Sequence, residues 1–107
     1  MSGHPSQAIV VLMTASNRDE ASRLAEMLVS SRLAACVQIL PEMRSVYRWH
    51  GKVEHADEAL LLAKTTSDKF AELDRAVRGM HSYDTPEIIA LPITAASQPY
   101  LKWLLEG

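Results

Sequence analysis

Three side chains in this sequence have the chemistry of ligands for a soft metal ion. Cys36 is the single cysteine, and His81 and Glu87 lie at the two ends of a polar loop. A thiolate and an imidazole suit copper or zinc, and a carboxylate adds an oxygen ligand. We therefore predict Cys36, His81 and Glu87 as metal ligands, although the sequence does not place them together. Tyr83, between the last two, would add a polar wall to a cleft.

Each of these residues also has an ordinary structural interpretation. Cys36 lies in the apolar stretch Leu33–Val37 and could be a small buried hydrophobic residue. The loop from His81 to Pro86 could be only the end of a helix and its connection to a strand. Burial and metal ligation make opposite predictions for the reactivity of the thiol, so both interpretations of Cys36 stay open.

The sequence lacks the usual signatures of catalysis. It has only four glycines, so it contains no glycine-rich phosphate loop, and no nucleophile-elbow or zinc-protease spacing occurs. Asn17 and Arg18 are of the residue types that small acyl-phosphate hydrolases use, but only analogy of fold would support that activity. We therefore expect no enzyme activity and no organic cofactor.

The composition is that of an ordinary globular protein. The 107 residues are 48% hydrophobic and 22% charged, with a net charge of −2, which favours one domain over residues 1–107. No basic cluster is present, and the longest apolar run is Ala8–Met13, so we expect neither a nucleic-acid nor a membrane partner. We expect a cytoplasmic location, because the start of the chain lacks a signal-peptide pattern, and disorder over residues 1–6.

The first two elements that position these residues are a strand and a helix. Residues 7–14 are almost continuously apolar, which predicts a strand covered on both faces. Asn17 stands three residues before Glu20, as in a capping box, and apolar residues at helical spacing predict a helix over Arg18–Ser31.

A long hairpin is predicted next. A strand over Leu33–Ile39 is interrupted by Pro41, where we expect a bulge or a bend. Polar and apolar residues then alternate as far as Trp49, and Gly51 can supply the positive φ of the reversal. The return strand runs to Ala63, so the inner half of the hairpin belongs to the core and the outer half projects.

The remaining pattern completes an α+β fold. A second helix begins at Thr66 or Ser67 and ends near Gly79, a third apolar strand covers Glu87–Leu91, and Ser97–Pro99 opens a short C-terminal helix. This order predicts a ferredoxin-like βαββαβ sandwich, in which two helices cover one face of a four-stranded antiparallel sheet.

The outer half of the hairpin favours an oligomer. It carries Tyr47 and Trp49 on one face, and both rings would stand in solvent in an isolated chain. A two-stranded ribbon is marginally stable alone, and open sheet edges need a cover. We expect a closed homo-oligomer, and the alternative is a hairpin that folds back over its own sheet.

Several segments together resemble the CutA divalent-cation tolerance proteins, over about residues 7–105. The matching segments are Leu33–Val37, Tyr47–Lys52, Lys64–Thr66, Thr85–Ile93 and Tyr100–Leu104. The resemblance implies a ferredoxin-like subunit, a homotrimer similar to the PII signalling proteins, and a cytoplasmic role in tolerance to copper and other divalent metals. It carries over no catalytic residue.

The resemblance also implies residues for the contacts between subunits. We expect the following residues at subunit interfaces or in the clefts between subunits: Tyr47, Trp49, Lys52, Lys64, Tyr83, Tyr100 and Trp103. Three positions depart from the family pattern. His50 replaces a glutamate at the hairpin tip, Ser82 replaces a proline and so implies a looser loop, and Ala96 replaces a glycine before the last helix.

Two functions follow as hypotheses. The first is a homotrimeric protein that binds divalent cations, copper above all and zinc as a second choice, and confers tolerance without turnover. The alternative is a trimeric signalling or scaffold protein, similar to the PII proteins, that binds a small effector between subunits and acts on an unidentified protein partner.

Overall fold

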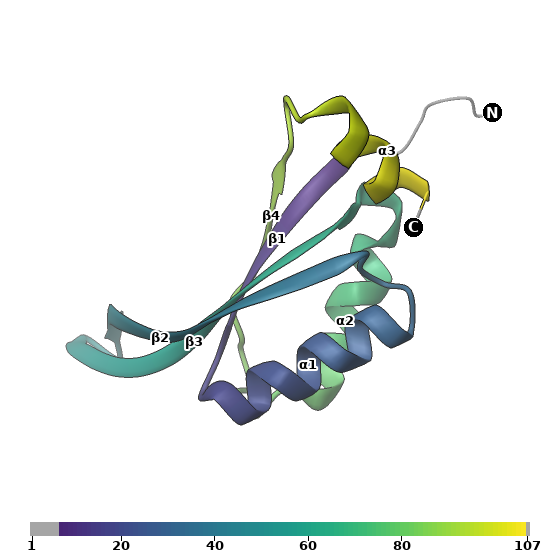
Figure 1. Ribbon diagram of the computed structural model, residues 1–107. Helices are drawn as coiled ribbons and strands as arrows, with labels where there is room; N and C mark the ends of the chain where they lie inside the picture. Colours follow the sequence, from purple (N-terminus) through teal and green to yellow (C-terminus); the bar gives the residue numbers. More distant parts are fainter. Residues whose placement is uncertain (1–6, 107) are drawn as a thin grey trace.

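The computed structural model describes residues 7–106, which form one four-stranded antiparallel sheet with two helices on one of its faces (Figure 1). The strand order is β2 (Cys36–Trp49), β3 (Lys52–Thr66), β1 (Ala8–Ala15) and β4 (Ile88–Pro92). The covering helices are α1 (Arg18–Ser30) and α2 (Phe70–Met80). The predicted ferredoxin-like sandwich is confirmed. The disorder expected over residues 1–6 lies outside the described residues.

Strand β1 lies at the centre of the sheet and supplies much of the core. It pairs antiparallel with β3 on one side and with β4 on the other. Val11 and Met13 are fully buried on the helix side. Val10 and Leu12 on the other side are only half-buried. The prediction that both faces are covered is therefore wrong for the single chain, because α1 and α2 cover one face alone.

The β2–β3 hairpin is continuous and projects past the helices (Figure 1). Its register shifts between Leu40 and Met43, which confirms the bulge predicted at Pro41. The two-residue reversal has φ 50° at His50 and φ 79° at Gly51. Both values are positive, as a type I′ turn requires, so His50 takes part in the turn as well as Gly51.

The second half of the chain adds the edge strand β4 and covers one end of the molecule with α3. A 3₁₀ turn, η1 (Ser67–Lys69), precedes α2, so the predicted second helix begins as a tighter turn. Helix α3 (Gln98–Glu106) buries Leu104 and lies at the end of the sheet away from the hairpin tip (Figure 1). Over residues 7–106, no helix is both long and apolar enough to cross a membrane.

Candidate functional site

The sheet face opposite α1 and α2, here called the open face, is largely apolar, and no layer formed by residues 7–106 covers most of its area. Directly paired residues point to the same side, so the register defines this face. Its residues are Val10, Leu12, Cys36, Gln38, Leu40, Leu60, Leu62, Lys64, Ile89 and Leu91. Leu40 is 53% exposed and Ile89 is 48% exposed. Exposed apolar surface of this extent is typical of a face that a partner covers.

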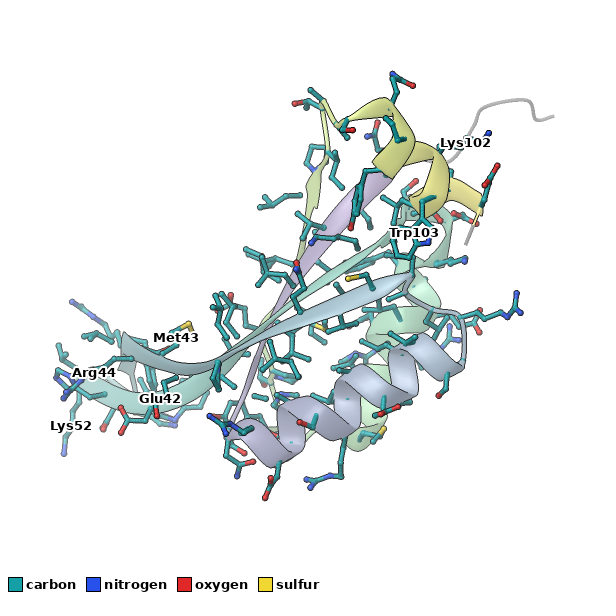
Figure 2. The ribbon with its side chains drawn as sticks, viewed as in Figure 1. Glu42, Met43, Arg44, Lys52, Lys102 and Trp103 are labelled. Atoms are coloured by element: carbon teal, nitrogen blue, oxygen red, sulfur yellow. The ribbon has the colours of Figure 1, made fainter. Side chains whose placement is uncertain are left out.

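The outer half of the hairpin, here called the arm (residues 43–58), also exposes large apolar side chains. Tyr47 is 43% exposed and Trp49 is 55% exposed. Val46 and Val53 on the other side are exposed as well. The arm stands away from its own sheet (Figures 1 and 2), so the alternative in which it folds back and buries the rings is wrong for the single chain.

Cys36 lies on the open face at the first position of β2. Its thiol is free and partly exposed, and its cross-strand partner is Lys64. The Lys64 ammonium donates a hydrogen bond to the Gln38 side chain and lies 6.0 Å from the centre of the Tyr100 ring. That ring stands 5.5 Å from the ring of Trp103. The structure thus gathers Lys64, Tyr100 and Trp103 at the corner of the open face where Cys36 lies.

The other expected interface residues lie elsewhere. Lys52 is next to the hairpin tip, and Figure 2 places it at the opposite end of the molecule from Trp103. Tyr83 lies in the loop after α2, where its ring is 4.8 Å from the ring of His81. One chain therefore presents three separate groups of the expected residues, at α3, at the arm and at this loop.

His81 is a fully buried side chain with both ring nitrogens engaged. Nε2 lies 2.7 Å from the carbonyl oxygen of Thr14, and Nδ1 accepts a hydrogen bond from the Tyr83 amide at 3.0 Å. A carbonyl can only accept and an amide can only donate, so this geometry assigns the ring proton to Nε2. The ring thereby fastens the loop to β1, and neither nitrogen is free to bind a metal.

Glu20 holds the same loop from the side of α1. Its Oε1 accepts from the Ser16 amide at 2.8 Å and the Ser16 hydroxyl at 2.9 Å, and its Oε2 accepts from the Ser82 amide at 2.7 Å. The Ser82 hydroxyl adds a fourth bond at 3.1 Å. Burial alone would raise the pKa of Glu20, but these hydrogen bonds outweigh burial and lower the pKa to about 2.

The sequence predicted only the capping role of Glu20. That role is confirmed in part, because the Asn17 side chain accepts from the Glu20 amide at 2.8 Å. The bonds from Ser82 correct the expectation of a looser loop. A proline at this position could not donate its amide, whereas Ser82 donates both an amide and a hydroxyl. The only local sign of this interaction in the sequence was a serine in place of proline at position 82. Its partner, Glu20, lies 62 residues away in sequence.

Tyr83 extends the network to β3. Its hydroxyl donates to Glu58 Oε2 at 2.8 Å. Burial of the ring, together with this bond and the negative charge of Glu58, raises the pKa of Tyr83 to about 12. Tyr83 is therefore a neutral phenol at physiological pH and acts as a hydrogen-bond donor.

The three predicted metal ligands lie at two ends of the sheet within one chain. Glu87 directly precedes β4, whose first residue Ile88 pairs with Met13, and Met13 is next to Thr14, the residue that His81 contacts. Cys36 pairs with Lys64, whereas Thr14 pairs with Leu60, so the two partners are about 13 Å apart along β3 at ~3.3 Å per residue. Cys36 and Thr14 also lie on opposite sides of β3 in the sheet. Among residues 7–106, no three His, Cys, Asp or Glu side chains are grouped so as to hold a metal ion. A site that includes Cys36 and His81 would need a second chain.

Comparison with known proteins gives the same family throughout. A sequence model of the CutA1 divalent ion tolerance proteins matches residues 9–107. The divalent-cation tolerance protein CutA of Thermus thermophilus is 47% identical over 98 residues, which cover 92% of this chain and 95% of that protein. Protein CutA, chloroplastic, of Arabidopsis thaliana is 47% identical over 97 residues, which cover 91% of this chain and 53% of that protein.

A solved structure agrees with the sequence matches. The periplasmic divalent cation tolerance protein CutA of Archaeoglobus fulgidus has a TM-score of 0.89 at 41% identity, and the match covers 92% of this chain and 96% of that chain. The names of these relatives place one in the chloroplast and one in the periplasm, so a cytoplasmic location for this chain stays a prediction. Because the sequence model spans nearly the whole chain and over two fifths of the aligned residues are identical in these relatives, the chain belongs to the family of CutA1 divalent ion tolerance proteins.

Proposed function

We propose that this chain forms a homotrimer that binds divalent cations, copper above all, and confers tolerance to them without catalysing a reaction. The observation that carries the proposal is the position of Cys36, a free thiol on the uncovered face of a chain whose relatives are named for divalent-cation tolerance. In this proposal one domain spans residues 1–107 and works in the cytoplasm, where a thiol stays reduced.

Association is supported by the open face and the arm. Both expose large apolar side chains, and β2 and β4 are the two edge strands of the sheet. Edge strands and apolar faces attract further copies of the chain, and a head-to-tail arrangement that closes gives a ring. Three copies would bury the open faces and give the arms a surface to pack against. The expected interface residues would then lie between subunits.

Cys36 is the ligand that the single chain supports best. Its sulfur is partly accessible and prefers soft metals such as Cu(I) and zinc. Glu87 is exposed and offers carboxylate oxygens from the other end of the sheet. His81 would have to give up its bond to Thr14 or to Tyr83 before it could bind an ion. We keep both as proposed partners of Cys36, supplied by a neighbouring copy.

The metal content of matched variants tests this proposal. Wild type, Cys36→Ser and Glu87→Gln would be dialysed against copper or zinc with a weak competing chelator, and bound metal determined by elemental mass spectrometry. His50→Ala and Glu54→Gln, on the arm, are the controls. We expect stoichiometric copper in wild type and the controls and its loss in Cys36→Ser. Equal copper in wild type and Cys36→Ser, or none in wild type, would refute the assignment.

The alternative of a trimeric signalling or scaffold protein with an effector between subunits is not favoured, because the names of the relatives describe cation tolerance.

A further inference from the structure

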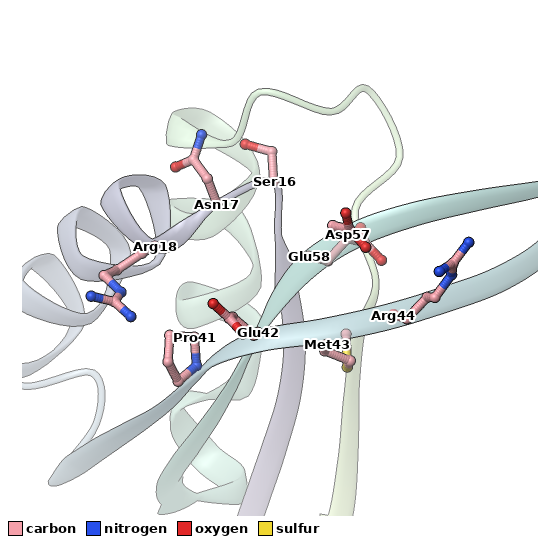
Figure 3. A pocket seen from close by; sticks show the side chains of 9 residues that line it. All are labelled: Ser16, Asn17, Arg18, Pro41, Glu42, Met43, Arg44, Asp57 and Glu58. Carbon is pink, nitrogen blue, oxygen red and sulfur yellow. The ribbon is translucent and has the colours of Figure 1, made fainter.

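A cleft of about 560 Å³ opens at the base of the arm, beside the start of α1 (Figure 3). Three segments line it, namely the turn Ser16–Arg18, the bulged segment Pro41–Arg44 of β2 and the pair Asp57–Glu58 of β3. Its volume lies in the range of pockets that bind small organic molecules. None of the proposed metal ligands lines it, so the cleft is independent of the proposed cation site.

The β-bulge gives the cleft its central side chain. Pro41 and Glu42 together stand opposite the single residue Ala59, so Glu42 has no cross-strand partner. A bulge bends its strand and redirects the side chain of the extra residue. In Figure 3, Glu42 lies between Arg18 on the α1 side and the acidic pair Asp57 and Glu58 on β3.

Most of the charges around the cleft are without partners. The side chains of Arg18, Glu42, Arg44 and Asp57 make no hydrogen bond or ion pair within residues 7–106. Arg44 and Asp57 remain unpaired although they are direct cross-strand neighbours. Glu58 is held by the Tyr83 hydroxyl at 2.8 Å. The Asn17 side chain already caps the start of α1, so we do not propose the helix N-terminus as a binding group for the ligand.

The charge count defines the ligand. Two guanidinium groups and three carboxylates leave the lining with one excess negative charge. A ligand that carries one carboxylate and two cationic nitrogens would neutralise this excess charge and give three of the four unpaired groups a partner. We propose that this cleft binds a free dibasic amino acid, such as arginine or lysine. The Arg44 guanidinium would bind the ligand carboxylate through two parallel hydrogen bonds, and Glu42 and Asp57 would bind its cationic nitrogens.

Isothermal titration calorimetry with the full chain tests the proposal through the ligand. The titrants would be arginine, lysine, agmatine, which is arginine without its carboxylate, and glutamate, which has the opposite net charge. We expect arginine and lysine to bind, agmatine to bind at least about tenfold more weakly, and glutamate to give no heat. Absence of binding by arginine and lysine at millimolar concentration would overturn the proposal.

Matched variants test the residues. Arg44→Gln should weaken arginine binding by at least about tenfold without weakening agmatine binding, and Glu42→Gln should weaken both. Arg48→Gln and Glu54→Gln lie further along the arm and should match wild type. Equal affinity in all four variants would refute the proposal. A change in assembly mass in Glu42→Gln would also refute it, because the cleft would then be a subunit contact. Copper content and assembly mass are measured on the same samples. They show whether the proposed copper-binding trimer fails independently of amino-acid binding in the cleft.

Discussion

At the scale of single residues, the Glu20 carboxylate joins the start of α1 to Ser82, which lies 62 residues after Glu20 in sequence. It accepts bonds from Ser16 at the end of β1 and from Ser82 in the loop that carries His81 and Tyr83. Its oxygens only accept, and all four of its partners only donate there. Charge at this position therefore stabilises the fold instead of opposing it.

Glu20→Gln tests this role. A glutamine would direct an amide donor at the serine donors, so we expect unfolding to be easier by about 1–3 kcal/mol at neutral pH. Chemical denaturation measures the loss. Glu26→Gln, exposed on the same helix, is the control and should change stability by less than about 0.5 kcal/mol. Equal stability of Glu20→Gln and wild type would contradict the role.

The difference in unfolding free energy between wild type and Glu20→Gln should depend on pH with a definite sign. The pKa of Glu20 falls from 4.5 to about 2 on folding, so its contribution is complete above about pH 4.5 and is lost as the pH falls toward 2. The stability gap between wild type and Glu20→Gln should shrink over this interval. Denaturation at several pH values between 2 and 7 measures it, and a gap that widens on acidification would contradict the assignment.

At the scale of elements, the end of α1 carries a conformational cost that can be removed. Arg32 has φ 63°, in the left-handed region. The Leu33 amide donates to the Leu28 carbonyl at 2.9 Å, and the Arg32 amide donates to the Val29 carbonyl at 3.1 Å. These two bonds form a Schellman motif, whose left-handed position favours glycine. An arginine there is strained by its Cβ atom.

Arg32→Gly should therefore stabilise the protein, by up to about 1 kcal/mol, because glycine adopts this backbone region without strain. The control is Arg23→Gly, within α1, which should destabilise by about 1 kcal/mol because glycine costs helix entropy. Opposite signs in denaturation curves are the expected result. A loss of stability in both variants would show that the Arg32 side chain makes a contact that outweighs its strain.

The elements themselves could be predicted because their signals are local. The apolar run of β1, the cap at Asn17 and the break at Pro41 each depend on a few adjacent residues, and all are confirmed. The positive φ at His50 could not be assigned, because it depends on the pairing of Trp49 with Lys52, which fixes a two-residue turn.

The candidate site depended on contacts that no local pattern contains. His81 was predicted as a ligand from its side-chain type, but its nitrogens are occupied by Thr14 and Tyr83, and the first is far away in sequence. The register of β3 likewise places Cys36 and Thr14, the residue that His81 contacts, four residue pairs apart along the sheet. Only the tertiary fold sets these relations.

At the scale of the whole molecule, we expect substitutions of two exposed apolar residues, one on the open face and one on α1, to affect assembly differently. Leu40 on this face is 53% exposed, and Val29 on α1 is 44% exposed. If copies associate through the open face, Leu40→Asp places a charge in the interface and should dissociate the assembly, whereas Val29→Asp should leave it intact. Light scattering after size-exclusion chromatography measures the mass. The same mass for both variants would place the interface elsewhere.

Native mass spectrometry during a copper titration tests in one spectrum whether the chain forms a trimer and whether that trimer binds copper. We predict an assembly of about 36 kDa, three times the chain mass of 11.9 kDa, that takes up copper in discrete steps. We also predict that Cys36→Ser keeps this mass and loses the copper steps. A wild-type monomer, or a wild-type trimer with no copper bound, would contradict the proposed function.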